Sequence, residues 1–146
     1  MKRSPLLLLL VLAIASLSLA ACGQQPAGDG DAGEVAPPQP PAEYAAMTNP
    51  FAGDATAAAT GQVDYESYCQ SCHGSGGKGD GPAASSLDPK PGNLAELVKT
   101  ASDGYIFWRV AEGGMMAPFN SSMPAWKDVL NQDQIWQVVT YIETFN

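Results

Sequence analysis

The chain has 146 residues, which is enough for one small domain. Fifteen acidic residues oppose seven basic ones, and two of the basic ones, Lys2 and Arg3, belong to a leader that we expect to be removed. This excess of negative charge disfavours binding to nucleic acids, whose phosphates select basic surfaces. Two of the three cysteines are three positions apart and the third is far upstream, so we expect no structural disulfide.

Residues 1–21 have the pattern of a secretory leader, in which two basic residues precede an apolar run from Leu6 to Leu19. The run is short for a membrane-spanning helix. It ends in Leu19-Ala20-Ala21-Cys22, which resembles a bacterial lipobox, whose cysteine is acylated and becomes the mature N-terminus. We therefore expect Cys22 to carry lipid. The alternative is an ordinary signal peptide that is cleaved nearby, with Cys22 incidental.

Residues 22–60 have the composition of a disordered linker, because they are rich in Pro, Ala and Gly and include five acidic residues but no basic ones. Such a segment cannot bury enough apolar surface to offset the entropy lost on ordering. It suits a tether between a membrane anchor and a globular domain. Its most apolar part, residues 44–51, is expected either to dock on that domain or a partner, or to be an unstructured tail.

A first helix is expected over about Gly61 to Ser71, with Thr60 as its N-cap. It leads into Cys69-Gln70-Ser71-Cys72-His73, the C-x-x-C-H pattern of covalent c-type haem attachment. Two thiols at this spacing lie on one side of a helical turn, where both can reach the vinyl groups on one edge of a porphyrin. The adjacent imidazole then becomes an axial ligand to iron. We therefore predict one covalent haem c, held by these two cysteines and ligated by this histidine.

Two other interpretations of this motif are weaker. A structural zinc site needs four ligands, and away from the leader the chain has only Cys69, Cys72 and His73, so a carboxylate would have to come from elsewhere. A thioredoxin-like redox pair needs a βαβ setting, and the sequence shows no such alternation.

The segment 74–82 is glycine-rich, but its Lys78 is followed by glycine where a phosphate-binding loop needs Ser or Thr. We expect it instead to lie along the edge of a flat cofactor, since glycine allows the backbone to approach closely. A short helix is expected at Asn93–Lys99. Another should begin after Ser102 and run to about Glu112.

Phe107 and Trp108 on that helix are expected to be core or haem-wall residues. Residues 113–130 show no periodicity and are predicted to be a loop. The last helix should begin after Asn131, with Gln134 completing a capping box, and its apolar positions recur at helical spacing.

The chain has one histidine, so a second axial ligand to a six-coordinate iron must be another residue type. Met123 is the leading candidate, because Pro124 restricts its backbone to extended forms and a well-capped helix follows. A thioether ligand favours reduced iron and raises the reduction potential. Met115 and Met116 are rivals, but they follow two glycines and lack this stiffening. The methionines that do not bind iron are expected to pack in the core.

Residues 61–146 resemble a monohaem class I cytochrome c, in the C-x-x-C-H motif that ends the first helix and the Met-Pro-Ala-Trp loop before the last one. The resemblance implies an all-α class I cytochrome c fold wrapped around one covalent haem. It implies that the two terminal helices cross, with Gly61 and Tyr65 against Tyr141. It also implies a proline carbonyl that accepts the axial histidine N–H and fixes its ring, and Pro82 is the match.

The wider layout is similar to cytochrome subunits of bacterial respiratory or photosynthetic complexes, in particular the monohaem lipoprotein subunit of alternative complex III, which oxidises quinol. The likeness lies in the lipobox, the acidic tether, an Asn-Pro-Phe patch and Gly-Lys-Gly-Asp-Gly-Pro. It implies one-electron transfer with other redox subunits as partners and no small-molecule substrate. The haem domain would lie on the periplasmic side of the cell membrane, anchored by lipid at Cys22.

The alternatives are a free-standing lipid-anchored electron shuttle, a haem peroxidase or gas-binding module, and a subunit in which haem only stabilises the fold. A peroxidase or gas-binding module needs an open iron position and a polar distal group, and the only histidine is already used. We therefore expect an electron carrier that is not itself an enzyme.

Overall fold

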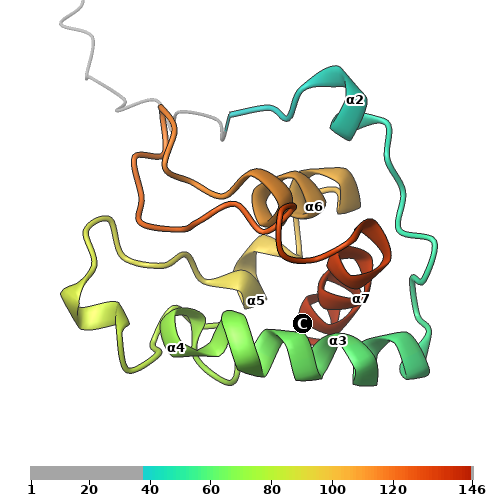
Figure 1. The fold of residues 1–146 in the computed structure, drawn as a ribbon, viewed down its shortest axis with the longest axis horizontal. Helices are drawn as coiled ribbons and strands as arrows, with labels where there is room; N and C mark the ends of the chain where they lie inside the picture. Colours follow the sequence, from blue (N-terminus) through green and yellow to red (C-terminus); the bar gives the residue numbers. More distant parts are fainter. Residues whose placement is uncertain (1–37, 146) are drawn as a thin grey trace, which may run out of the picture. The chain divides into compact units, whose positions relative to one another are not determined.

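The structure, a computed structural model, describes residues 38–145, so the predicted leader and Cys22 lie outside the described residues. All regular elements in this range are helical (Figure 1), which confirms the predicted fold class. No helix in the described range is long and apolar enough to cross a membrane. In chain order the elements are α2 (Ala42–Ala45), α3 (Ala55–Tyr68), α4 (Gln70–His73), the 3-10 helix η1 (Ala84–Ser86), α5 (Leu94–Leu97), α6 (Asp103–Glu112), α7 (Gln132–Ile142) and the 3-10 helix η2 (Glu143–Phe145).

Helix α3 begins earlier than the sequence suggested. Its cap is Asp54 rather than Thr60, and the Asp54 carboxylate accepts hydrogen bonds from the backbone N–H groups of Thr56 and Ala57. Alanine is the strongest helix former, so the alanine-rich residues 55–60 extend the helix once this cap is in place. The predicted helix start and the predicted linker boundary at residue 60 are therefore wrong.

Residues 41–54, which we call the N-terminal arm, pack on the domain. Tyr44, Met47 and Phe51 contact the buried core. Asn49 is 7% exposed, and its side-chain amide donates to the Thr140 hydroxyl at 3.0 Å. Of the expectations for residues 44–51, docking on the domain is confirmed.

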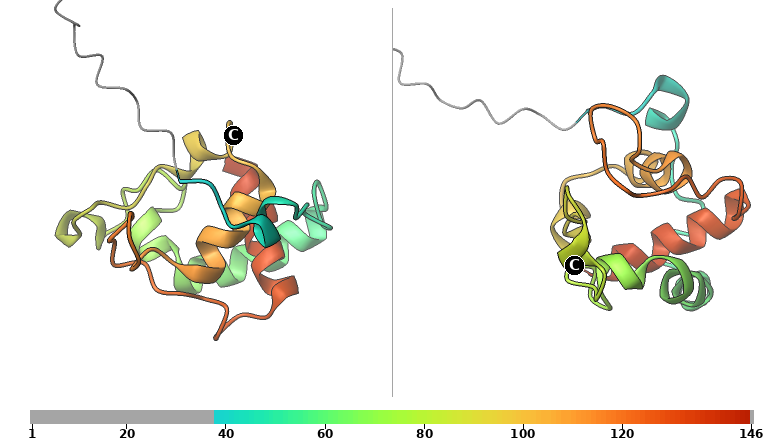
Figure 2. Two further views of the ribbon diagram at one scale, coloured as in Figure 1. Left: turned by 90° about the horizontal axis from the view of Figure 1, so that it is seen from above. Right: turned by 60° about the vertical axis from the view of Figure 1, so that its left-hand side comes forward.

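Helix α7 packs across α3 (Figures 1 and 2). The closest approach of the two backbones lies at Gly61. A Cβ atom at this position would lie 1.9 Å from the Gln137 backbone oxygen, so glycine alone allows this close approach. The fully buried Tyr65 ring meets the Tyr141 ring edge to face at 5.2 Å between centroids. The helix crossing and the Tyr65–Tyr141 contact implied by the cytochrome resemblance are confirmed, and Gly61 lies against the backbone of Gln137 and Val138.

The predicted bounds of α6 and the predicted start of α7 are confirmed. The Ser102 side chain accepts from the Tyr105 N–H at the start of α6, and Gly113 ends that helix with a φ of +70°. Asn131 and Gln134 form both bonds of a capping box at the start of α7. Each cap satisfies backbone groups that a helix end leaves without partners.

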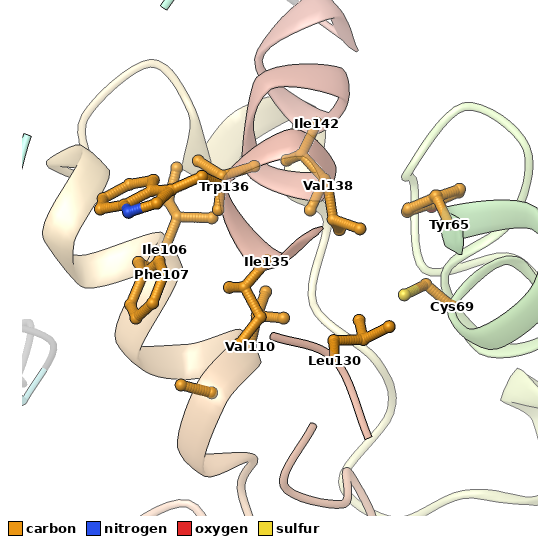
Figure 3. Close-up of a cluster of buried hydrophobic side chains, with 12 residues drawn as sticks. Tyr65, Cys69, Ile106, Phe107, Val110, Leu130, Ile135, Trp136, Val138 and Ile142 are labelled. Carbon is orange, nitrogen blue, oxygen red and sulfur yellow. The ribbon is translucent and has the colours of Figure 1, made fainter. Parts of the chain in front are cut away.

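The core lies between α6, α7 and the end of α3. Phe107 packs on Trp136 with ring centroids 4.3 Å apart. Figure 3 shows Tyr65 and Cys69 on one side of this cluster, facing side chains of α6 and α7. The core thus reaches the first cysteine of the C-x-x-C-H motif, and its packing positions that thiol.

Candidate functional site

The C-x-x-C-H motif forms a tight turn after α3. The Cys69 carbonyl accepts hydrogen bonds from the N–H groups of Cys72 and His73, at 3.1 and 2.9 Å. Helix α3 ends at Tyr68, and the four residues of α4 carry the rest of the motif. The turn places both thiols and the imidazole on the wall of one cavity, as the spacing predicted.

The cavity has a volume of about 390 Å³, within the usual size range of small-molecule and cofactor sites. Its walls come from α3, α4, the segment 87–97, α6, the loop 119–126 and the end of α7. Apolar and aromatic side chains dominate the lining, among them Tyr68, Ile106 and Trp126. Such walls suit a flat, mostly apolar cofactor and exclude water from it.

Met123 lines this same cavity, on the loop between α6 and α7. The Gly114 N–H donates to the Met123 carbonyl at 2.9 Å, which holds the loop against the end of α6. The rivals Met115 and Met116 are 71% and 39% exposed and are absent from the cavity wall, so neither packs in the core. The geometry favours Met123 among the three, and its bond to iron stays a prediction.

The His73 ring is held by a carbonyl other than the predicted one. Its Nδ1 lies 3.2 Å from the Gly92 oxygen, and the expectation that Pro82 supplies this acceptor is wrong. Two contacts of Gly79 bring Gly92 close to the His73 ring. The Gly79 N–H donates to the His73 carbonyl, and Gly79 packs tightly against Pro91, the residue before Gly92. A carbonyl can only accept, so Nδ1 donates and Nε2 keeps its lone pair for a metal.

The glycine-rich segment 74–82 has a different role from the one expected. None of its residues lines the described cavity. A Cβ at Gly77 would lie 2.5 Å from the Phe145 ring, and the Gly74 carbonyl accepts from the Tyr65 hydroxyl at 2.7 Å. The glycines therefore allow close packing against the protein itself, and the prediction of a loop along the cofactor edge is wrong.

Burial sets the protonation of the motif side chains. It lowers the pKa of His73, and the hydrogen bond to Gly92 opposes this only in part. The imidazole is therefore neutral at neutral pH, which is the form that binds a metal. Burial raises the pKa of the Cys69 thiol to about 12, with smaller contributions from Asp64 and Cys72.

Arg109 is a site residue that the sequence reasoning missed. It lines the cavity, and its buried Nη1 has no hydrogen-bond partner among the described residues. Its guanidinium carbon lies 3.3 Å from the Phe119 ring centroid, and burial lowers its pKa. A buried guanidinium N–H without an acceptor is costly, so this atom indicates that the ligand carries an acceptor group, which an anion supplies best. The feature of the sequence that could have indicated this role is a basic residue, Arg109, within a mainly apolar predicted helix.

The donor set fits a haem. Two thiols, an imidazole and a thioether line one apolar cavity, and the Arg109 Nη1 without a hydrogen-bond partner suits a haem propionate. Within residues 38–145, no three His, Cys, Asp or Glu side chains gather as a metal-ion site would need, so no carboxylate completes a zinc site there.

A model of the family described as cytochrome c oxidase, cbb3-type, subunit III matches residues 56–142, which is more than half of the chain. Among solved structures, a chain of the reducing HAO-like protein complex of Kuenenia stuttgartiensis is similar, with a TM-score of 0.57 and 24% identity. The match covers 74% of this chain and 50% of that one, so this chain spans about half the length of that neighbour. The likeness supports the fold. No curated protein matches the sequence.

Proposed function

The chain belongs to the family described as cytochrome c oxidase, cbb3-type, subunit III, and from this premise we propose that it carries single electrons within a membrane-bound electron-transport complex. Its cofactor is one covalently bound haem c, and its domain is that of a c-type cytochrome. The observation that carries the proposal is the convergence of Cys69, Cys72, His73 and Met123 on one cavity.

When bound, the haem supplies a one-electron redox couple at its iron. Cys69 and Cys72 would hold the group by thioether bonds. His73, oriented by the Gly92 carbonyl, would offer Nε2 to the iron, and Met123 would offer its sulfur. Arg109 would face a carboxylate of the group. With both residues bound to the iron, no position would remain for a substrate, which favours an electron carrier over a peroxidase.

Met123→Ala tests the ligand assignment directly, with Met116→Ala as the matched control on the same loop. We expect Met123→Ala to lose the weak sulfur-to-iron absorption band of the oxidised protein, to lower the reduction potential and to admit carbon monoxide to the reduced iron. Met116→Ala should change none of these. If Met116→Ala or Met115→Ala loses the band while Met123→Ala keeps it, the assignment is wrong.

The proposal includes a lipid anchor at Cys22 that holds the haem domain at the periplasmic face of the cell membrane. The lipobox-like residues 19–22 and the acidic linker support it. Acyl chains give membrane affinity in proportion to the methylenes they bury, and more than one chain gives stable anchoring. Mass spectrometry of the mature N-terminus is the test. An acylated Cys22 is expected, and a free end downstream of Cys22 would refute the anchor.

The partners would be the other redox subunits of the complex. The family's description names an oxidase subunit, and the sequence layout resembles a subunit of a quinol-oxidising complex. When the native protein is purified from membranes in mild detergent, the catalytic subunits of either an oxidase or a quinol-oxidising complex should copurify with it. A Cys22→Ser variant that still copurifies with them would favour a fixed subunit. Recovery of the wild-type cytochrome alone would favour a free-standing tethered shuttle.

A further inference from the structure

The N-terminal arm lies along α6. The Asn49 N–H donates to the Asp103 carboxylate at 2.9 Å, at the first residue of the helix. The Tyr44 carbonyl occupies the space beside Gly104, where a Cβ would come within 2.0 Å of it. The Tyr44 side chain continues along the helix and packs near Phe107, with ring centroids 6.1 Å apart. The arm is therefore fixed to α6 by both backbone and side-chain contacts.

The loop that carries Met123 is fixed to the other end of the same helix. The N–H groups of Trp126 and Lys127 donate to the Ala111 carbonyl at 3.1 and 3.2 Å. Two residues past the end of the helix, the Gly114 N–H donates to the Met123 carbonyl at 2.9 Å. Met123 is thus bonded just past the end of α6, three residues before Trp126 is bonded to the last turn of that helix.

Glu112, the last residue of α6, joins the arm to this loop. Its Oε1 accepts from the Tyr44 hydroxyl at 2.5 Å, and its two oxygens accept from the Lys127 Nζ at 3.0 and 2.7 Å. The bonds to Lys127 and Tyr44 lower the pKa of the Glu112 carboxyl. The bond to Glu112 raises the pKa of Tyr44 to about 12, so the phenol stays a donor at neutral pH.

We infer that the N-terminal arm is a positioning element for Met123, acting through Tyr44, Glu112 and Lys127. The inference rests on the proposed function, since it needs Met123 as an iron ligand. The Lys127 side chain is 49% exposed, and an exposed ion pair by itself stabilises little. The Tyr44 hydroxyl holds the Glu112 carboxylate in place to bind Lys127. Lys127 comes four residues after Met123, so this ion pair anchors the loop that carries Met123.

The rate at which cyanide binds to the oxidised holoprotein measures how firmly Met123 is held, because Met123 must leave the iron before cyanide can bind. Tyr44→Phe keeps the ring and removes only the hydroxyl, and it should raise the binding rate roughly fivefold, the effect of one hydrogen bond of ordinary net strength. Glu112→Gln should also raise the rate. The double variant should be no faster than Glu112→Gln alone, since Tyr44 acts on the loop only through the Glu112–Lys127 ion pair, which Glu112→Gln already weakens.

Tyr141→Phe is the matched control, because its hydroxyl makes no hydrogen bond within the described residues while its ring packs in the core. It should leave the rate unchanged. A rate for Tyr44→Phe equal to that of the wild type, or an equal rise in Tyr141→Phe, would overturn the inference alone. A wild-type protein that binds cyanide as fast as Met123→Ala would instead overturn the proposed ligand and the inference together.

Discussion

Replacing Gly61 by alanine should force α3 and α7 apart. The added Cβ would lie 1.9 Å from the Gln137 carbonyl oxygen, 2.2 Å from its carbon and 2.7 Å from the Val138 nitrogen. All three are backbone atoms of a helix, which cannot turn aside as the end of a flexible side chain can. The helices must therefore separate, and the buried contact of Tyr65 with Tyr141 must be disturbed.

The size of the effect follows from two opposing terms. Overpacking a close contact costs about 1–3 kcal/mol, and a contact of 1.9 Å with backbone belongs at the upper end. Alanine gains about 1 kcal/mol over glycine within a helix. The net loss is then about 2 kcal/mol in the free energy of unfolding. For a domain of this size that lowers the melting temperature by roughly 8–16 °C.

Thermal unfolding of the holoprotein, followed by circular dichroism, measures this loss. Gln62→Ala is the control, since it changes an exposed neighbour on the same helix and should stay within about 0.5 kcal/mol of the wild type. If Gly61→Ala melts at or above the wild-type temperature, helix propensity outweighs the crossing contact and the reasoning is wrong.

Haem should stay with the wild-type polypeptide in acid acetone, whereas replacing both Cys69 and Cys72 by serine should abolish this retention; extraction from the wild type would contradict covalent attachment. Arg109→Gln should lower the reduction potential, because a nearby cation disfavours oxidised iron, and Arg109→Lys should restore most of it; a redox titration that finds no shift would remove Arg109 from the site. Burial raises the pKa of the Glu143 carboxyl above its value in the unfolded chain. The free energy of unfolding therefore falls as pH rises from the unfolded-state pKa through the folded-state pKa. Glu143→Gln should therefore be more stable than the wild type at pH 7, with a difference that shrinks below about pH 4, and denaturant titrations showing the opposite trend would refute this.

Features of this protein that involve neighbouring residues were predictable from sequence. The caps at Ser102 and Asn131 bond backbone groups three residues away, so the residue types alone indicate the contact. The C-x-x-C-H motif is likewise complete within one turn. Met123 was favoured over Met115 and Met116 because Pro124 restricts its backbone, and it is the one of the three that lines the cavity.

The start of α3 was missed although its signal is local. Asp54 is a good N-cap and alanine a strong helix former. The alanine-rich residues 55–60 were assigned to the linker on composition, which does not distinguish a helix from a coil.

Only the tertiary structure decided which distant groups meet. The Gly92 carbonyl that orients His73 is 19 residues away, and the Thr140 hydroxyl that binds Asn49 is 91 residues away. Arg109 likewise acquires its role only because the cavity forms around it. Each of these contacts depends on how whole helices pack, and helix packing depends on the shape of the entire core, which no single stretch of sequence encodes.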